Sequence, residues 1–213
     1  MDNPNSVSNS YILAHTSLES EVLQKLHRET WAKVYAPQMI ASHLQGSLLR
    51  MISYMIRPQR VLEVGTFTGY SAICLAAGLA EGGKLHTIEI NRELEEIAVR
   101  YITEAGLENS IVRHYGEARN IIPALDCLFD LVYIDACKEQ YIDFYELIIP
   151  KLRSGDFILA DNALWYGKVS DPSVVNEKDT DAIRSFNNHV QRDARTENMI
   201  LPFEDGIMLI RKK

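Results

Sequence analysis

The chain of 213 residues has a hydrophobic fraction of 46%, a charged fraction of 24% and a formal net charge of −7 at pH 7. Length and composition are typical of one globular domain with its own core, so we expect a single domain over residues 1–213. The negative charge argues against non-specific binding to nucleic acid or anionic membranes. No apolar run approaches the roughly 18 residues that a membrane-spanning helix needs.

The three cysteines are odd in number and show no CxxC spacing, which argues against a disulfide framework and a zinc knuckle. Residues 1–10 are polar and contain no apolar core of a secretory signal. We therefore expect a protein of the reducing cytoplasm. We also expect residues 1–8 to be disordered.

Two helices are predicted before the first strand, and together they form a helical cap segment over residues 1–56. Residues 16–19, Thr-Ser-Leu-Glu, have the spacing of a capping box, which predicts a helix from there to about Tyr35. Pro37 predicts the start of a second helix over 38–56. The apolar stripe of this helix is typical of packing rather than of cofactor binding.

Residues 61–71, Val-Leu-Glu-Val-Gly-Thr-Phe-Thr-Gly-Tyr-Ser, organise the rest of the chain. An apolar strand over 61–64 leads into the glycines Gly65 and Gly69, and a helix is predicted over 72–79. Strand, glycine turn and helix begin a βαβ unit, in which glycines let the backbone approach a ligand. Glu63 lies inside the apolar strand, where its carboxylate must be paired or exposed at the strand end.

Strands and helices alternate along the remaining chain, which predicts an α/β, Rossmann-like doubly wound sheet of about seven strands, mostly parallel, with helices on both faces. The expected strands are 84–89, 110–115, 129–135 and 157–161, and the expected helices are 91–105, 117–125, 139–152 and 181–195. A C-terminal hairpin of 199–203 and 207–211 must place at least one strand antiparallel. The polar loop 163–179 is long enough to serve as a lid or substrate loop.

Three expected strands end in an acid, namely Glu89, Asp135 and Asp161. Because the carboxyl ends of parallel strands meet at one edge of the sheet, these residues predict an acidic cleft there. Asp135, Asp161 and Asn162 offer two carboxylates and an amide oxygen, which suit a hard cation such as Mg²⁺. The alternative for Asp161 and Asn162 is an Asx-type turn.

Lys138 follows Asp135 by three residues, and its structural alternative is an ordinary solvated lysine. Beside a divalent cation its ammonium would be disfavoured, so that a neutral amine could act as a base. Trp165 has two interpretations of equal weight, an aromatic wall for a substrate or an anchor for the loop.

The cofactor class is indicated by the glycine pattern and by Glu89. Glu89 lies 24 positions after Gly65, close to the offset at which an acid meets ribose hydroxyls, although a solvated helix-capping acid is the alternative. The pattern Gly65-Thr-Phe-Thr-Gly69 lacks the middle glycine of the dinucleotide signature, so a pyrophosphate has less room. This favours a nucleoside ligand without phosphates, such as S-adenosylmethionine, over NAD.

Five motifs in combination resemble the cation-dependent O-methyltransferases, a family of class I S-adenosylmethionine-dependent methyltransferases that includes caffeoyl-CoA and catechol O-methyltransferases and small bacterial relatives. The motifs occupy residues 61–71, 88–91, 133–138, 160–165 and 205–209. The resemblance extends from about Met39 to the C-terminus.

The resemblance implies a role for each matching residue. Asp135, Asp161 and Asn162 would hold the metal, which is Mg²⁺ or else Mn²⁺ or Ca²⁺, and Lys138 would accept the acceptor's proton. S-adenosylmethionine would be lined by Met39, Ala41, Glu63, Gly65, Thr66, Phe67, Ser71, Glu89, Ile90, Gly116, Glu117, Ala118 and Asp135. Cys137 stands where the family usually has a second aspartate, and Ala41 where it often has a hydroxyl residue.

We therefore expect divalent-metal-dependent methyl transfer from S-adenosylmethionine to a hydroxyl of a catechol-like or other vicinal-diol phenol. The resemblance also implies a homodimer, with neither nucleic acid nor membrane as partner. A metal-independent methyltransferase is the nearest alternative. An NAD-binding oxidoreductase and a non-catalytic nucleotide-binding module are more distant alternatives.

Overall fold

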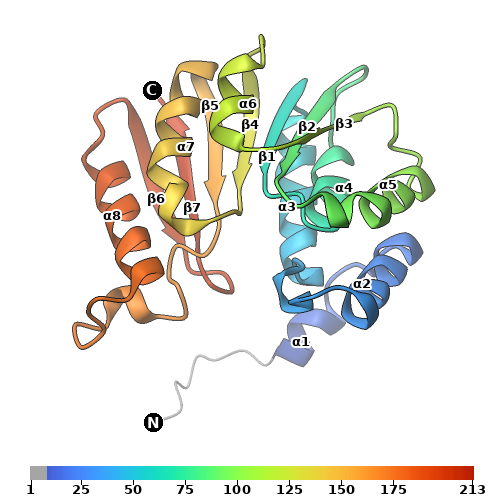
Figure 1. The fold of residues 1–213 in the computed structure, drawn as a ribbon, viewed down its shortest axis with the longest axis horizontal. Coiled ribbons are helices and arrows are strands. Elements are labelled where there is room, and N and C mark those ends of the chain that lie inside the picture. The colour runs from blue at the N-terminus through green and yellow to red at the C-terminus, as the bar shows by residue number, and fades with distance from the viewer. Residues whose placement is uncertain (1–8) are drawn as a thin grey trace.

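A computed structural model of the protein describes residues 9–213, so the expected disorder of residues 1–8 lies outside the described part of the chain. Seven strands form one sheet in the order β3-β2-β1-β4-β5-β7-β6, with helices on both faces (Figure 1). The predicted fold class is therefore confirmed.

The sheet is parallel except at one strand. Its strands are β1 (Arg60–Val64), β2 (Lys84–Glu89), β3 (Ile111–Tyr115), β4 (Phe129–Ile134), β5 (Leu152–Ala160), β6 (Thr196–Leu201) and β7 (Ile207–Lys212). β7 pairs antiparallel with both β5 and β6, and the other strand pairs are parallel. β5 begins before the expected residue 157 because Leu152 already pairs with Phe129, across a register shift.

Both faces of the sheet are buried, which explains its nearly continuous apolar strands. Alternate residues point to opposite faces, so that Val61 belongs to one apolar cluster and Leu62 to the other. The first face is covered by α3 (His43–Ile56), α4 (Tyr70–Ala76) and α5 (Glu95–Glu104), and the second by α6 (Ala118–Ala124), α7 (Tyr141–Ile148) and α8 (Lys178–Arg192) (Figure 1).

The helix predicted from residue 16 begins elsewhere. A short helix α1 (Asn9–Ala14) comes first, and the Thr16 hydroxyl donates back to the carbonyl of Ile12 at 2.7 Å. α2 (Glu21–Lys33) starts after Ser20, whose hydroxyl accepts from the backbone N–H of Leu23 at 3.4 Å. The capping-box prediction is wrong because Thr16 completes the first helix instead of opening the second.

The helix predicted over 38–56 is split in two. Pro37 opens only the short 3₁₀ helix η1 (Pro37–Met39), and Ile40 then adopts an extended conformation. α3 starts after Ser42, whose hydroxyl accepts from the backbone N–H of Gln45 at 3.0 Å. The cap at Ser42 therefore decides where α3 begins.

Several other boundaries move by a few residues. The helix expected over 91–105 divides into η2 (Arg92–Leu94) and α5, and that over 139–152 into η3 (Lys138–Gln140), α7 and η4 (Ile149–Lys151). The last helix ends at Arg192 rather than at residue 195, because the Asp193 carboxylate accepts from the backbone N–H of Arg195 at 2.8 Å. β6 consequently starts at Thr196 instead of residue 199.

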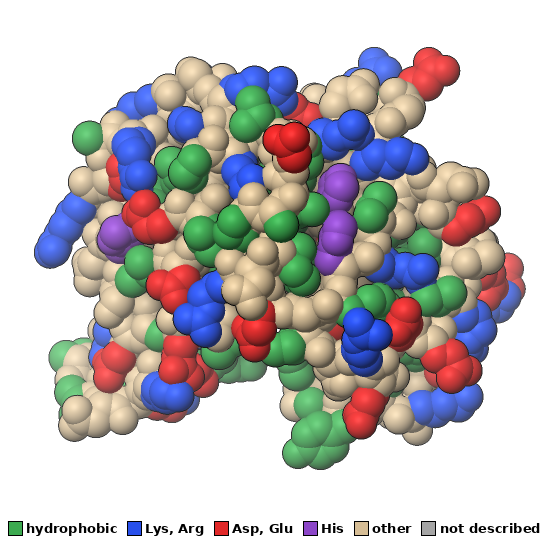
Figure 2. Space-filling model, turned by 45° about the horizontal axis from the view of Figure 1, so that its top comes forward, with side chains coloured by type: hydrophobic (Ala, Val, Ile, Leu, Met, Phe, Trp, Pro, Cys, Tyr) green, Lys and Arg blue, Asp and Glu red, His purple; other side chains and the backbone are tan. Residues whose placement is uncertain are grey.

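The surface in view mixes both signs of charge. Figure 2 shows acidic and basic side chains interleaved on the face that it displays, with no broad basic area. Within residues 9–213, no helix is long and apolar enough to cross a bilayer.

Candidate active site

The glycine turn after β1 lies directly against the end of β4. Gly65 has φ +104°, and a Cβ added there would come 1.9 Å from the backbone oxygen of Asp135. The backbone N–H of Asp135 donates to the carbonyl of Val64 at 2.9 Å. A residue without a side chain is therefore required at 65, and the close approach brings the proposed cofactor turn beside the first proposed metal ligand.

Asp135 and Asp161 extend from neighbouring parallel strands. Ile134 of β4 is in register with Ala160 of β5, and the backbone N–H of Asp161 donates to the carbonyl of Ile134 at 2.9 Å. Burial, and after it the negative charge of Asp135, raises the pKa of Asp161 to about 7. The predicted acidic edge thus brings two mutually repelling carboxylates together.

The Asp161 carboxylate is held by two buried side chains that the sequence analysis did not identify. Its Oδ2 accepts from Nε2 of Gln45 at 2.5 Å and from the hydroxyl of Tyr133 at 3.1 Å. Its Oδ1 accepts from the adjacent backbone N–H of Asn162 at 2.8 Å. These bonds, rather than the Asx-type turn considered as an alternative, fix the orientation of the carboxylate.

Asn162 has φ +56° and makes its side-chain contact with the C-terminal hairpin. Its Nδ2 donates to Oδ2 of Asp205 at 3.1 Å. Because Nδ2 is the donor, the amide oxygen is the end of the side chain that can coordinate a cation.

Lys138 is buried rather than solvated. Its Nζ donates to Oδ1 of Asp135 at 2.9 Å and to the hydroxyl of Tyr141 at 2.7 Å. Burial lowers the pKa of the Lys138 amine, but Tyr141 and Asp135 together outweigh burial and raise the pKa above its usual value. Paired with Asp135 in this way, Lys138 is an ammonium. Its Nζ also lies 5.8 Å from the centre of the Trp165 ring.

Glu89 fastens the glycine turn to the end of β2. Its Oε2 accepts from the backbone N–H of Phe67 at 2.7 Å, and its Oε1 from that of Asn91 at 2.8 Å. The backbone N–H of Gly116 donates to the Glu89 carbonyl at 2.9 Å, which brings Gly116, one of the residues expected to line S-adenosylmethionine, to the same edge.

Glu63 is fully buried and is paired through one of its oxygens, which is the first of the two expected alternatives. Its Oε2 accepts from the hydroxyl of Thr87 at 2.5 Å, and that hydroxyl lies 2.5 Å from the hydroxyl of Thr66. Its Oε1 has no hydrogen-bond partner within the described residues. Burial raises the pKa of Glu63 to about 8.

The other residues predicted to bind the cofactor differ in their burial. Ser71 is buried in the first turn of α4, and Ala118 is buried at the start of α6, which Glu117 precedes as N-cap residue. Ala41 packs against the same apolar cluster as Phe67. Met39 and Ile90, 62% and 64% exposed, extend into solvent instead.

Gln45, Tyr133, Tyr141 and Asp205 are the site residues that the sequence analysis did not assign. Gln45 is the most telling of them, because a buried amide on the inner side of an amphipathic helix requires a polar partner. That signal could have marked Gln45 as a site residue, but its partner lies 116 positions away in sequence.

No three His, Cys, Asp or Glu side chains of residues 9–213 are grouped so as to hold a metal. The proposed ligand set has two carboxylates and one amide, so it depends on Asn162 as the third oxygen donor. The set contains oxygen ligands alone, which is the chemistry that Mg²⁺, Mn²⁺ and Ca²⁺ prefer.

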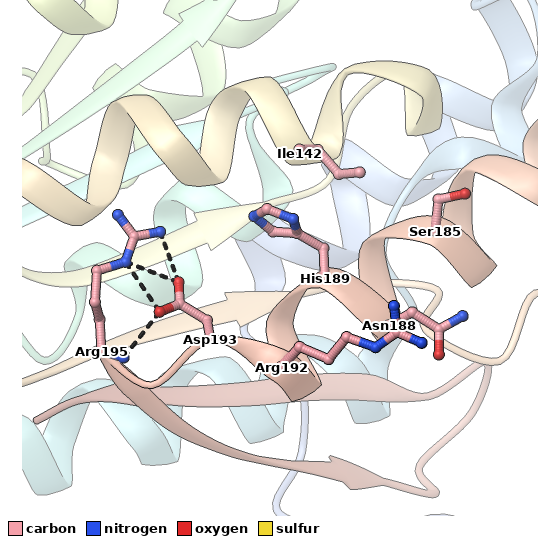
Figure 3. Close-up of a pocket in the computed structure, with 7 residues that line it drawn as sticks. All are labelled: Ile142, Ser185, Asn188, His189, Arg192, Asp193 and Arg195. Carbon is pink, nitrogen blue, oxygen red and sulfur yellow. Dashed lines mark hydrogen bonds and ion pairs between the residues drawn. The ribbon is translucent and has the colours of Figure 1, made fainter.

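A separate hollow between α7 and α8 lies away from these residues (Figure 3). Its lining residues lie near the C-terminal end of α8, whereas the polar loop that follows Asn162 joins the N-terminal end of that helix. Arg195 is paired there with Asp193 and Glu146, and His189 with Glu146.

Known proteins match the chain over nearly its whole length. A sequence profile of the O-methyltransferase family matches residues 13–213. Caffeoyl-CoA O-methyltransferase 2 of Populus trichocarpa is 33% identical over 208 residues, which cover 91% of this chain and 83% of that protein.

Solved structures agree in fold and in chemistry. The O-methyltransferase from Bacillus cereus, solved in complex with SAH, has a TM-score of 0.89 and 26% identity and covers 96% of each chain. The O-methyltransferase TomG from Streptomyces achromogenes, solved in complex with SAM, has a TM-score of 0.85 and 29% identity and covers 96% of this chain and 95% of that one. On the match of profile, sequence and structure, this chain belongs to the O-methyltransferase family.

Proposed function

We propose that the protein transfers the methyl group of S-adenosylmethionine to one hydroxyl of a small catechol-like phenol, and that a divalent cation assists at Asp135, Asp161 and Asn162. The observation that carries the proposal is the contact of Gly65 with the backbone of Asp135, where a Cβ would be only 1.9 Å away. It joins a ligand-binding turn to a cluster of oxygen ligands. The relatives solved with SAH and SAM support the choice of methyl donor.

The residues around the turn fit this donor. S-adenosylmethionine carries a cationic amine and a ribose diol, and it supplies an electrophilic methyl group on its sulfonium sulfur. The unpartnered Oε1 of buried Glu63 is a site where a cationic donor group would be stabilised. The Glu89 carboxylate, at the end of β2, is the acceptor for the ribose hydroxyls.

The oxygen cluster fits a divalent cation. Burial and the neighbouring Asp135 charge raise the pKa of Asp161, so a positive charge between the two carboxylates would be favoured. Asp135, Asp161 and Asn162 would hold the cation, which would supply a lowered pKa for a hydroxyl beside it. Neither histidine nor cysteine belongs to the set, which argues against zinc.

Lys138 is the proposed general base. Its raised pKa depends on Asp135 and Tyr141, so a competing positive charge on Asp135 would lower that pKa and free the amine to accept a proton. The phenolate oxygen would then form a bond to the methyl carbon while the carbon–sulfur bond breaks, and the electron pair of that bond would stay on sulfur. Trp165, whose ring centre lies 5.8 Å from Nζ, suits the role of an aromatic wall.

The charges of the acceptor loop, residues 163–179, favour an acceptor without phosphates. Lys168 is paired with Glu177, and Nζ of Lys178 lies 2.6 Å from Oε1 of Glu139. Lys168 and Lys178, the first residue of α8, are therefore both already paired with an acid. We accordingly propose a free phenol rather than a coenzyme A thioester as the preferred acceptor.

The test is methyl transfer from labelled S-adenosylmethionine to catechol, with resorcinol and caffeoyl-CoA as matched alternatives. We expect turnover of catechol, which can chelate with both oxygens, and at least about tenfold less with resorcinol, whose hydroxyls are not adjacent, or with the thioester. EDTA should abolish turnover, and added Mg²⁺ should restore it. Full activity in EDTA would contradict the metal assignment and favour the metal-independent alternative.

Lys138→Ala should reduce kcat by roughly 10²- to 10⁴-fold, the usual contribution of a general base. The Kd for S-adenosylmethionine should change little, because the expected cofactor contacts lie on other residues. Titration calorimetry provides this control. Unchanged kcat in a folded variant would show that another group takes the proton.

We also propose a cytoplasmic location, because Cys74, Cys127 and Cys137 are free thiols, which suits a reducing compartment.

A further inference from the structure

The tip of the β6–β7 hairpin is hydrogen-bonded to the start of the acceptor loop. Oδ2 of Asp205 accepts from Nδ2 of Asn162 at 3.1 Å, and its Oδ1 accepts from the backbone N–H of Tyr166 at 2.5 Å. The backbone carbonyl of Asp205 accepts from the N–H of Leu164 at 2.9 Å. One residue thus makes three contacts with a turn of five residues.

The turn of residues 162–166 has an unfavourable backbone conformation. Asn162, Trp165 and Tyr166 have φ values of +56°, +46° and +55°, in the left-handed region that residues with side chains seldom adopt. At Trp165 and Tyr166 this conformation costs on the order of 1 kcal/mol each and persists only where the surroundings enforce it, whereas asparagine adopts it more readily. The contacts of Asp205 with Asn162 and Tyr166 supply that enforcement at two of the three positions.

The chemistry of the Asn162 contact also decides which end of the amide faces the site. The oxygen and nitrogen of an asparagine side chain are nearly equal in size, so shape alone does not choose between its two orientations. A carboxylate can only accept, and Asp205 therefore selects Nδ2 for itself. The amide oxygen is then the end left for a cation.

We propose that Asp205 is a positioning residue, which presents the Asn162 amide oxygen to the cation and holds the loop that carries Trp165 and Tyr166. The cation half of this inference rests on the proposed function, whereas the loop half does not. Asp205 acts through Asn162 and the loop.

Asp205→Asn tests the proposal with almost no change of shape. Asp205 meets Asn162 and Tyr166 with different oxygens, and an amide replaces one of these oxygens by an NH2 donor, so at the same position it can accept from only one of the two. Glu204→Gln is the matched control, because it makes the same chemical change at the adjacent position. Glu204 accepts from the hydroxyl of Ser42 at 2.5 Å instead.

The first readout is the Kd for Mn²⁺, measured by electron paramagnetic resonance without acceptor. We expect Asp205→Asn to weaken binding by about 10-fold or more, as is usual when a partner of a metal ligand is removed. The Kd of Glu204→Gln for Mn²⁺ should stay within about twofold of that of the original protein. The Kd of Asp205→Asn for S-adenosylmethionine should also stay within about twofold. Exchanging both residues, as Asn162→Asp with Asp205→Asn, restores a donor–acceptor pair and should recover most of the Mn²⁺ affinity.

The second readout needs no metal. In a Trp31→Phe background, which leaves Trp165 as the sole tryptophan, Asp205→Asn should increase acrylamide quenching of Trp165 fluorescence, and Glu204→Gln should not. If Asp205→Asn folds poorly, Asp205→Glu, which displaces the same acceptor by one methylene, is measured in its place.

The proposal is overturned if the Asp205 variant leaves both Mn²⁺ affinity and quenching unchanged, or if Glu204→Gln has the same effects. If the original protein binds no Mn²⁺, the cation half is overturned together with the metal assignment of the proposed function. The quenching comparison then decides the loop half alone.

Discussion

Two buried carboxylates dominate the electrostatics of the site, and they differ in how they are satisfied. Asp161 accepts three hydrogen bonds, from Gln45, Tyr133 and Asn162. Glu63 is fully buried with one oxygen unpaired, and burial raises its pKa to about 8 from the ordinary value of 4.5. Glu63 therefore makes folding depend on pH in the neutral range.

We expect Glu63→Gln to flatten the pH dependence of stability. A raised pKa means that the folded protein holds a proton that the unfolded chain has released. The stabilisation is full below pH 4.5 and is lost as the pH rises through about 8. Each unit of pKa difference is worth about 1.4 kcal/mol, so the loss amounts to a few kcal/mol.

Thermal denaturation between pH 6 and 9 measures this effect without ligands. The Tm of the original protein should fall by about 5 °C or more over this range, and that of Glu63→Gln by clearly less. Glu81→Gln, a change at an exposed acid, should follow the original protein. Parallel curves for all three proteins would exclude Glu63 as the source of the pH dependence.

The sequence predicted the site residues at strand ends better than the residues that hydrogen-bond to them. Asp135, Asp161 and Glu89 each follow an apolar strand, and parallel strands necessarily bring such residues to one edge. Tertiary packing brings Gln45 to Asp161 and Asp205 to Asn162. No local sequence pattern therefore predicts these contacts. The charged state of Lys138 likewise depends on Tyr141, a contact made inside the fold.

At the scale of elements, the β1–α4 turn is the least tolerant of change. Gly65 and Gly155 have similar positive φ values, +104° and +98°. A Cβ at Gly65 would meet the Asp135 oxygen at 1.9 Å, whereas a Cβ at Gly155 meets nothing within 4 Å. Substitutions at the two glycines therefore distinguish the cost of a steric clash from the cost of a strained backbone.

We expect Gly155→Ala to cost about 1 kcal/mol of unfolding free energy, since it suffers only the left-handed backbone penalty. Gly65→Ala should cost several kcal/mol and abolish binding of S-adenosylmethionine, because β1 and β4 would have to separate. Urea denaturation and calorimetry provide the two measurements. Equal costs at the two positions would refute the argument from close approach.

Element types were predictable along most of the chain because strand and helix periods differ so clearly. Boundaries failed where a single side chain decides them. Ser20 and Ser42 each cap a helix that was predicted to begin several residues earlier. In sequence, another candidate cap such as Thr16 is equally suitable. The early start of β5 depends on its pairing with β4, which no local pattern contains.

At the scale of the whole molecule, the N-terminal helices expose an unusual amount of apolar surface. Of the fourteen exposed large hydrophobic side chains found among the described residues, nine lie between Tyr11 and Met55. Exposed apolar surface of this kind marks interfaces. We therefore propose that the protein is a homodimer joined through these helices.

The dimer should appear in size-exclusion chromatography with light scattering as twice the chain mass of 24.2 kDa. Met51→Glu with Met55→Glu, on α3, should shift it to monomer, because a charge in an apolar interface is costly. Met199→Glu is the control, since Met51 and Met199 are 55% and 51% exposed, respectively. A monomeric original protein, or an equal shift with the control, would refute this interface.

The position of β7 has a consequence for how the protein is made. β7 is the last strand of the chain, yet it lies between β5 and β6, and the hairpin that leads into it carries Asp205. Until β7 has been synthesised, β5 lacks this neighbour and presents an open edge that other chains could pair with. Chains truncated before residue 205 should lack both β7 and the Asp205 contact with Asn162, so they should have an unfinished site and tend to aggregate.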